Sequence, residues 1–253
     1  LPGGKINKIT IDTGKISLNF GDDVELDELS LNNVAAYSDG FDLHNHDLTI
    51  NSDFSTAIPI TNLKNFTVNG NFTTVTASQE FTATSITVTE KFTNKSKILA
   101  GVVNAYEFEN QADGYLGDGT HSVVFNVGKS FQDDSTNYQH LSEINADFSQ
   151  EPVASEITLS GSVNVNITPD INVINGGTGK KLSISGGKFS TVEYSDDGAE
   201  IEINNSPTIS TLQITAPDGT LTIDGTPSVT SSISLNGSSG HYLYISGNGS
   251  LNY

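Results

Sequence analysis

The chain has no cysteine, no methionine and no tryptophan, and all eleven of its basic residues are lysine. Without cysteine it has no disulfide framework, no thiolate metal site and no cysteine nucleophile. The first residues, Leu1 to Gly4, include neither an initiator methionine nor a leader, so we expect a processed product or an excised segment. No apolar run is long enough to span a bilayer, and we expect no membrane insertion of this segment.

Positive charge is also scarce. The chain has thirty acidic residues and eleven lysines, which gives a formal net charge of −19. A chain of this charge repels nucleic acid and anionic lipid, so we expect no nucleic-acid partner. Hydrophobic residues make up 35% and interrupt a remainder rich in Ser, Thr, Asn and Gly every few positions, which argues against disorder.

Short apolar–polar–apolar triplets recur along the chain at a step of about 19 or 20 residues. Such triplets predict short strands with alternate side chains facing inward. A second apolar series, from Phe41–Leu43 to Ile233–Leu235, runs between them and gives each repeat at least two strand faces. It includes Ile60, Phe81 and Val102. The triplets are Leu29–Leu31, Leu48–Ile50, Phe66–Val68, Ile86–Val88, Tyr106–Phe108, Phe125–Val127, Ile144–Ala146, Val163–Val165, Leu182–Ile184, Ile201–Ile203, Leu221–Ile223 and Tyr242–Ile245.

The regular step predicts an all-β fold, a single-stranded parallel β-solenoid with about a dozen coils of about 19–22 residues. An antiparallel sandwich also has short strands and polar turns, but its strand spacing is usually irregular. Because no strict six-residue apolar repeat is found, we expect a right-handed β-helix. We expect one domain over 1–253, with a region of N-terminal cap strand over 1–28.

Two side-chain columns are expected along the coils. A phenylalanine often follows six residues after a triplet begins, and in stacked coils these rings would form an internal aromatic column. Asn51 and Asn69 occupy the same place in successive repeats, which predicts an asparagine stack. The phenylalanines are Phe54, Phe72, Phe92 and Phe131.

Two segments, 109–118 and 132–139, contain few apolar residues and are expected to be enlarged loops. Loops on a repeat scaffold are where binding usually occurs. We therefore expect a binding surface near them, with Tyr106, Tyr115 and Tyr138 as candidate binding residues.

Metal-ligating side chains gather near the N-terminus. His44 and His46 lie on one face of an expected strand with a carboxylate beside them, a set that can bind Zn²⁺ or Ni²⁺. Asp22, Asp23 and Glu25 concentrate negative charge that can hold Ca²⁺ together with backbone carbonyls. A solvated face is the alternative for both groups, and no other cofactor is expected.

No catalytic residue is expected. The paired acids Asp133–Asp134 and Asp196–Asp197 could serve a glycosidase, which needs two carboxylates facing one bond, but turn positions explain them as well. A pectate-type lyase base would have to be lysine, since the chain has no arginine.

The repeats Leu48-Thr-Ile-Asn-Ser-Asp-Phe54 and Phe66-Thr-Val-Asn-Gly-Asn-Phe72 resemble the coils of bacterial surface β-helix proteins, the autotransporter passengers and filamentous-haemagglutinin-type adhesins. The resemblance implies a secreted or cell-surface protein that attaches to host or neighbouring-cell surface molecules or glycans. Two alternatives stay open: a self-associating subunit of an extracellular filament or biofilm matrix, and a β-helix polysaccharide lyase or hydrolase.

Overall fold

The computed structural model describes residues 3–11, 20–31, 41–77, 79–135, 137, 139–147, 156–159, 170–174, 181–184, 188–195 and 197–253. It is all-β, with 0% helix and 72% strand, and its parallel strands form a β-solenoid of about nine turns. The predicted fold class is confirmed. Within the described ranges no helix has the length and apolar character needed to cross a membrane.

The contacts within the chain group it into two compact units, unit 1 over 1–123 and unit 2 over 124–253. The expectation of one continuous domain stays a prediction.

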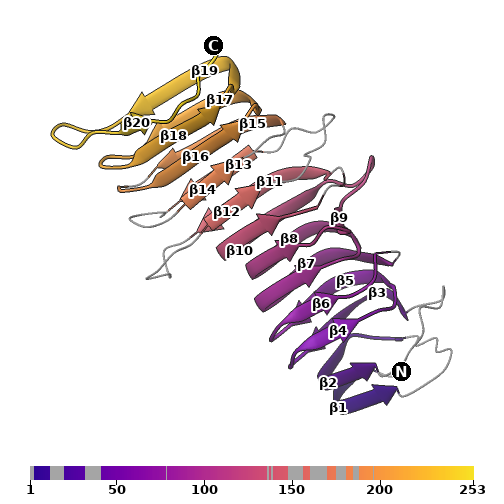
Figure 1. Cartoon of the computed structure of the whole chain (residues 1–253). Coiled ribbons are helices and arrows are strands. Elements are labelled where there is room, and N and C mark those ends of the chain that lie inside the picture. Colours follow the sequence, from indigo (N-terminus) through magenta and orange to yellow (C-terminus); the bar gives the residue numbers. More distant parts are fainter. Residues whose placement is uncertain are drawn as a thin grey trace. The chain divides into compact units, whose positions relative to one another are not determined.

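Unit 1 is a stack of parallel strands in which each coil lies against the next (Figure 1). The strand pairs are β1–β2, β2–β3, β3–β5, β4–β6, β5–β7, β6–β7, β7–β8 and β8–β9. The strands are β1 (Gly4–Ile11), β2 (Val24–Leu31), β3 (Phe41–Ile50), β4 (Phe54–Thr56), β5 (Ile60–Val68), β6 (Phe72–Thr74), β7 (Glu80–Asn94), β8 (Lys97–Asn110) and β9 (Tyr115–Leu116).

The core of unit 1 is built from columns of inward side chains, because alternate residues of a strand face the same side. One column runs from Leu48 through Phe66 and Ile86 to Val103, and each of these residues is buried and in register with the one before it. Three predicted triplets therefore occupy equivalent positions in successive coils.

Three register predictions in unit 1 were wrong. Val24, rather than Leu29, pairs with Leu48, because this coil is longer than the predicted step. Tyr106–Phe108 does not continue the triplet column. Its Phe108 pairs with Phe92 in the aromatic column, and Val103 takes the expected place. Phe81 pairs with Ile98, so Val102 does not continue the second series.

The aromatic column is confirmed within unit 1. Phe54 and Phe72 stack nearly parallel with ring centroids 5.7 Å apart, and Phe72 and Phe92 follow at 4.7 Å. Phe108 extends the column with an edge-on contact at 5.3 Å to Phe92. The asparagine stack is also confirmed, since Asn69 Nδ2 donates to Asn51 Oδ1 over 2.8 Å.

In unit 2 each strand pairs in parallel with the strand two places further along the chain, as expected when two strands make up a coil. Pairs from β10–β12 to β18–β20 follow this rule (Figure 1). The strands are β10 (Val123–Asp133), β11 (Leu141–Asp147), β12 (Glu156–Leu159), β13 (Asp170–Ile174), β14 (Lys181–Ile184), β15 (Lys188–Ser195), β16 (Glu200–Asn205), β17 (Thr208–Thr215), β18 (Thr220–Gly225), β19 (Ser228–Asn236) and β20 (Tyr244–Ser246).

The predicted triplets Leu182–Ile184, Ile201–Ile203 and Leu221–Ile223 are in register with one another, and their apolar members are buried. Other coils are longer: Ser130 pairs with Glu156 and Glu143 with Asp170. These longer coils explain why there are about nine turns and not about a dozen. Val163–Val165 lies outside the described residues.

The prediction of an enlarged loop over 109–118 was wrong. β8 runs on to Asn110 and β9 begins at Tyr115, so only a short turn separates them. Gln111 N and Tyr115 N donate to carbonyls of the preceding coil, which holds the segment on the solenoid. In the second predicted loop, 132–139, β10 includes residues 132–133, and residues 136 and 138 lie outside the described part of the chain.

Candidate functional site

A groove of about 460 Å³ lies on one face of unit 1, where successive coils turn a corner. The backbone at this corner is left-handed at His44, Asn45 and Asn62, with φ of 48°, 66° and 56°. Asparagine and histidine enter this region more readily than most residues. The groove is lined by His44, Asn45, Asn62, Leu63, Glu80, Thr82, Ala83, Thr84, Leu99 and His121.

The turns that shape the groove are held by hydrogen bonds between coils. Asp42 Oδ1 accepts from His44 N over 2.9 Å and from Asn62 Nδ2 over 3.1 Å. Asn62 N in turn donates to Thr82 Oγ1 over 2.9 Å. The hydrogen bonds that Asp42 accepts lower its pKa, and the bond from His44 N has a larger effect than the bond from Asn62. The Asp42 carboxylate therefore stays charged. Asn62 and Thr82 are therefore held in place before any ligand arrives.

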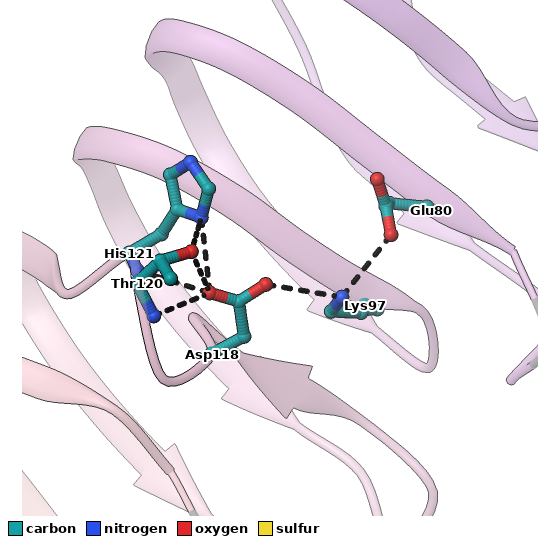
Figure 2. A network of polar contacts seen from close by, with 5 residues as sticks. All are labelled: Glu80, Lys97, Asp118, Thr120 and His121. Carbon is teal, nitrogen blue, oxygen red and sulfur yellow. Dashed lines mark hydrogen bonds and ion pairs between the residues drawn. The ribbon is translucent and has the colours of Figure 1, made fainter.

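A tight hairpin from Asp118 to His121 forms one end of the groove (Figure 2). Asp118 Oδ1 accepts from Thr120 N, Thr120 Oγ1 and His121 N, at distances of 2.8–3.0 Å, and His121 Nδ1 lies 3.0 Å from it. The hydrogen bond from the Thr120 backbone, followed by the one from the His121 ring, holds the pKa of Asp118 far below its ordinary value. The hydrogen bonds within the hairpin therefore hold the His121 ring in place at the groove.

Lys97 connects the hairpin to the preceding coil. Its Nζ lies 3.3 Å from Asp118 Oδ2 and 3.1 Å from Glu80 Oε2 (Figure 2). Burial of the ammonium group works against its charge, but hydrogen bonds to Glu80 and Asp118 outweigh it and raise the pKa of Lys97. The three side chains therefore form a fixed ionic bridge beside the groove.

The structure separates the tyrosines predicted as binding residues. Tyr115 on β9 is 41% exposed and pairs with Lys97, so it lies one coil beyond Lys97, in the coil that also carries Asp118. Tyr106 on β8 is 37% exposed and lies on another side of the coil, between Ala105 and Glu107. Tyr138 lies outside the described residues.

Some of the predicted metal ligands come together. Asp22, Asp23 and His46 each offer a ligand atom, and these atoms all lie within 4.8 Å of one another. Glu25 instead accepts from Lys5 and Asn51, and His44 lines the groove beside Asp42. The metal site stays a prediction, now reduced to three of its five residues.

Of the paired acids, only Asp133 and Asp134 are both described, and they differ in burial. Asp133 is buried at the end of β10, whereas Asp134 is exposed and accepts from Gln132 Nε2 over 2.6 Å. Asp196 lies outside the described residues and Asp197 is in an exposed turn. Of the first pair, therefore, one carboxylate lies in the interior and the other at the surface.

Sequence reasoning missed most of the groove, including Asn62, Thr82 and His121, and it also missed Lys97 in the ionic bridge beside it. One available signal was the Asp-Gly-Thr-His run at 118–121, where a turn-forming pair precedes a histidine. The contacts with Glu80 and Lys97 follow from the strand register, which no local motif encodes.

No protein-family model, no curated protein and no solved structure matches the chain.

Proposed function

We propose that this chain is a non-catalytic attachment protein that acts outside the cell or on its surface. The groove in unit 1 is its contact with surface molecules or glycans of host or neighbouring cells. The observation that carries the proposal is the groove itself, a depression of about 460 Å³ whose polar lining includes Asn62 and Thr82, both held by hydrogen bonds.

A pre-arranged polar lining favours binding, because the protein loses little side-chain freedom when the ligand arrives. The strands under the groove are paired on both sides, since β5 contacts β3 and β7, and β7 contacts β5 and β8. A rigid scaffold that presents its ligand contacts at turns is a common arrangement in repeat proteins.

The charged groups beside the groove argue for binding without catalysis. A glycosidase acid needs a raised pKa, and a lysine base needs a lowered one. Asp118 and Lys97 are shifted in the opposite directions, because each is stabilised in its charged form. Proton transfer by these groups is therefore unfavourable.

The extracellular location follows from the resemblance of the coils to autotransporter passengers and filamentous-haemagglutinin-type adhesins. The repeats Leu48–Phe54 and Phe66–Phe72 carry it, and their inward positions are occupied in register by Leu48 with Phe66 and Phe54 with Phe72. A chain without cysteine suits a passage through oxidising compartments, because it cannot form wrong disulfides.

The test is adhesion of the fluorescently labelled chain to cells, with a variant that fills the groove and a matched control. Thr84 lines the groove, whereas Thr93 faces outward on another part of the same strand β7. We expect Thr84→Arg to abolish adhesion and Thr93→Arg to leave it unchanged, with equal melting temperatures. Equal adhesion of the two variants contradicts the proposal. So does a fall in the viscosity of a polysaccharide solution on incubation with the chain.

One observation favours self-association as a second candidate function. In unit 2 the residues Tyr242, Tyr244 and Ile245 are 65%, 58% and 58% exposed, and large exposed apolar residues are of the kind that protein contacts cover. Sedimentation velocity at rising concentration is the test. We expect larger species that Tyr244→Ser with Ile245→Ser removes, and a constant monomer mass contradicts this function.

A further inference from the structure

We infer that the ligand of the unit 1 groove is a linear, uncharged glycan that crosses the strands, with its chain along the stacking direction of the coils. This inference rests on the proposed function and narrows it to one class of ligand. Three features of the groove carry it: the strand edges, the charges and the spacing of the lining side chains.

The strand edges argue against a peptide. An extended peptide binds a sheet by adding a strand to a free edge, where it receives main-chain hydrogen bonds. The groove crosses β5 and β7, and both have a parallel partner on each side. It therefore offers side chains and not an edge.

The charges argue against an ionic ligand. Asp42, Glu80 and Asp118 surround the groove, and the whole chain has a formal charge of −19, so an anionic polymer is repelled. A cationic ligand would need a carboxylate, but each of these three is already bonded, Asp42 to His44 N and the other two to Lys97. The polar groups of the lining that remain for a ligand are hydroxyl, amide and imidazole groups.

The lining combines the kinds of group that suit sugar rings. Thr82 pairs with Leu99, and Ala83 follows Thr82 in the lining, so hydroxyl and apolar groups lie side by side. A sugar ring has an apolar C–H face and a polar edge of hydroxyls, and a site for it needs both kinds of group.

The length of the groove suits a chain of several sugars. From β3 to β9 there are four steps between paired strands, β3–β5, β5–β7, β7–β8 and β8–β9. At about 4.8 Å per step this gives a track of roughly 19 Å. His44 lies on the first coil of the track and His121 on the hairpin that follows β9.

The test uses an array of linear uncharged glycans of increasing length beside uronate-containing and sulfated glycans, followed by calorimetry on the best ligand. We expect binding to an uncharged series, with affinity that rises with length and then levels off when the track is filled. Thr84→Ala should weaken binding about tenfold, as expected for the loss of one hydrogen bond of about 1.4 kcal/mol. Thr93→Ala on the same strand should have no effect.

The outcomes separate this inference from the proposed function. Preference for the anionic glycans, affinity independent of length, or equal effects of the two alanine variants overturns the inference. If the groove-filling variant Thr84→Arg abolishes cell adhesion but no uncharged glycan binds, the inference fails and the proposed function stands. If neither cells nor glycans bind through the groove, both fail.

Discussion

Asn94 and Asn110 lie one coil apart in the interior of unit 1, and Asn94 Nδ2 donates to Asn110 Oδ1 over 2.8 Å. Both side chains are fully buried. Thr74 Oγ1 donates to Asn94 Oδ1 over 2.8 Å from the preceding coil, and Ser96 N donates to the same oxygen over 3.0 Å. This polar ladder, defined by Thr74, Asn94, Ser96 and Asn110, joins three coils at one corner of the core.

We expect Asn94→Leu to lower the free energy of unfolding by about 2–4 kcal/mol, because several buried groups each lose a partner at about 1–3 kcal/mol. The measurement is urea denaturation followed by circular dichroism. Asn69→Ala is the matched control, since Asn69 donates to Asn51 in an exposed stack and its loss should change stability by only about 0.5 kcal/mol. If the two variants lose the same free energy of unfolding, burial of the polar ladder does not contribute to stability.

Gly114 closes the turn over the buried ladder, and its N–H donates to Gln111 O over 2.8 Å. A Cβ at this position would overlap Asn110 Oδ1 and crowd Asn94 Nδ2. We expect Gly114→Ala to destabilise the chain by about 1–3 kcal/mol, because neither amide can move without losing its hydrogen bond. In Gly119→Ala the added Cβ meets no heavy atom within 4 Å, so its melting temperature should match that of the unmodified chain.

Phe72 is the most connected ring of the aromatic column, with neighbours in its own coil and in those on both sides. Its centroid lies 5.2 Å from Phe66, 5.3 Å from Phe81 and 4.7 Å from Phe92. Phe72→Ala should cost about 3–5 kcal/mol of unfolding free energy, as expected when a large buried ring leaves a cavity. Phe72→Leu should cost less, and a thermal melt that ranks the two variants in the opposite order contradicts the packing described here.

The solenoid was predictable because the spacing of apolar residues is itself the signal. Leu48, Phe66 and Ile86 follow turns of similar length, so a constant step finds them. Val24 and Val103 were missed for physical reasons. The coil that follows Val24 is longer than the predicted step. The triplet that begins at Val103 ends in the small residue Ala105, whereas the nearby triplet that ends in Phe108 has a stronger apolar pattern.

The groove was less predictable, because it depends on backbone conformation and on register. The left-handed φ at His44 and Asn62 bends the strands at the corner, and asparagine only permits this geometry without requiring it. Lys97 meets Asp118 because the coils stack, which is a consequence of the whole fold. The histidines were read as metal ligands, and the structure divides them between the groove and the cluster at Asp23.

Asp118 should make unit 1 more stable above pH about 4 than below it. Its pKa is depressed in the folded chain, so its contribution is present above the unfolded value of about 3.9 and is lost as the pH falls below that value. We expect Asp118→Asn to be less stable than the unmodified chain at pH 7. The difference should shrink below pH about 4, in unfolding measured from pH 3 to 7.

Asp113→Asn is the control for this experiment, because Asp113 lies exposed in the turn before β9. It should leave the stability at pH 7 unchanged. A difference between Asp118→Asn and the unmodified chain that stays constant down to pH 3 would mean that the hydrogen bonds from Thr120 and His121 do not depend on the charge of the carboxylate.

In unit 2 a histidine and an aspartate are also in contact, but they come from successive coils. His241 Nδ1 lies 2.6 Å from Asp218 Oδ2. The hydrogen bond to Asp218 raises the pKa of His241 above its ordinary value, and the charge of the carboxylate adds to this. The contribution of the pair to stability is therefore full below pH about 6.5 and is lost as the pH rises through the raised pKa. In an NMR titration of the ring protons, Asp218→Asn should lower this pKa towards 6.5, whereas Asp134→Asn should not change it. A His241 titration unaffected by Asp218→Asn would mean that this contact does not form in solution.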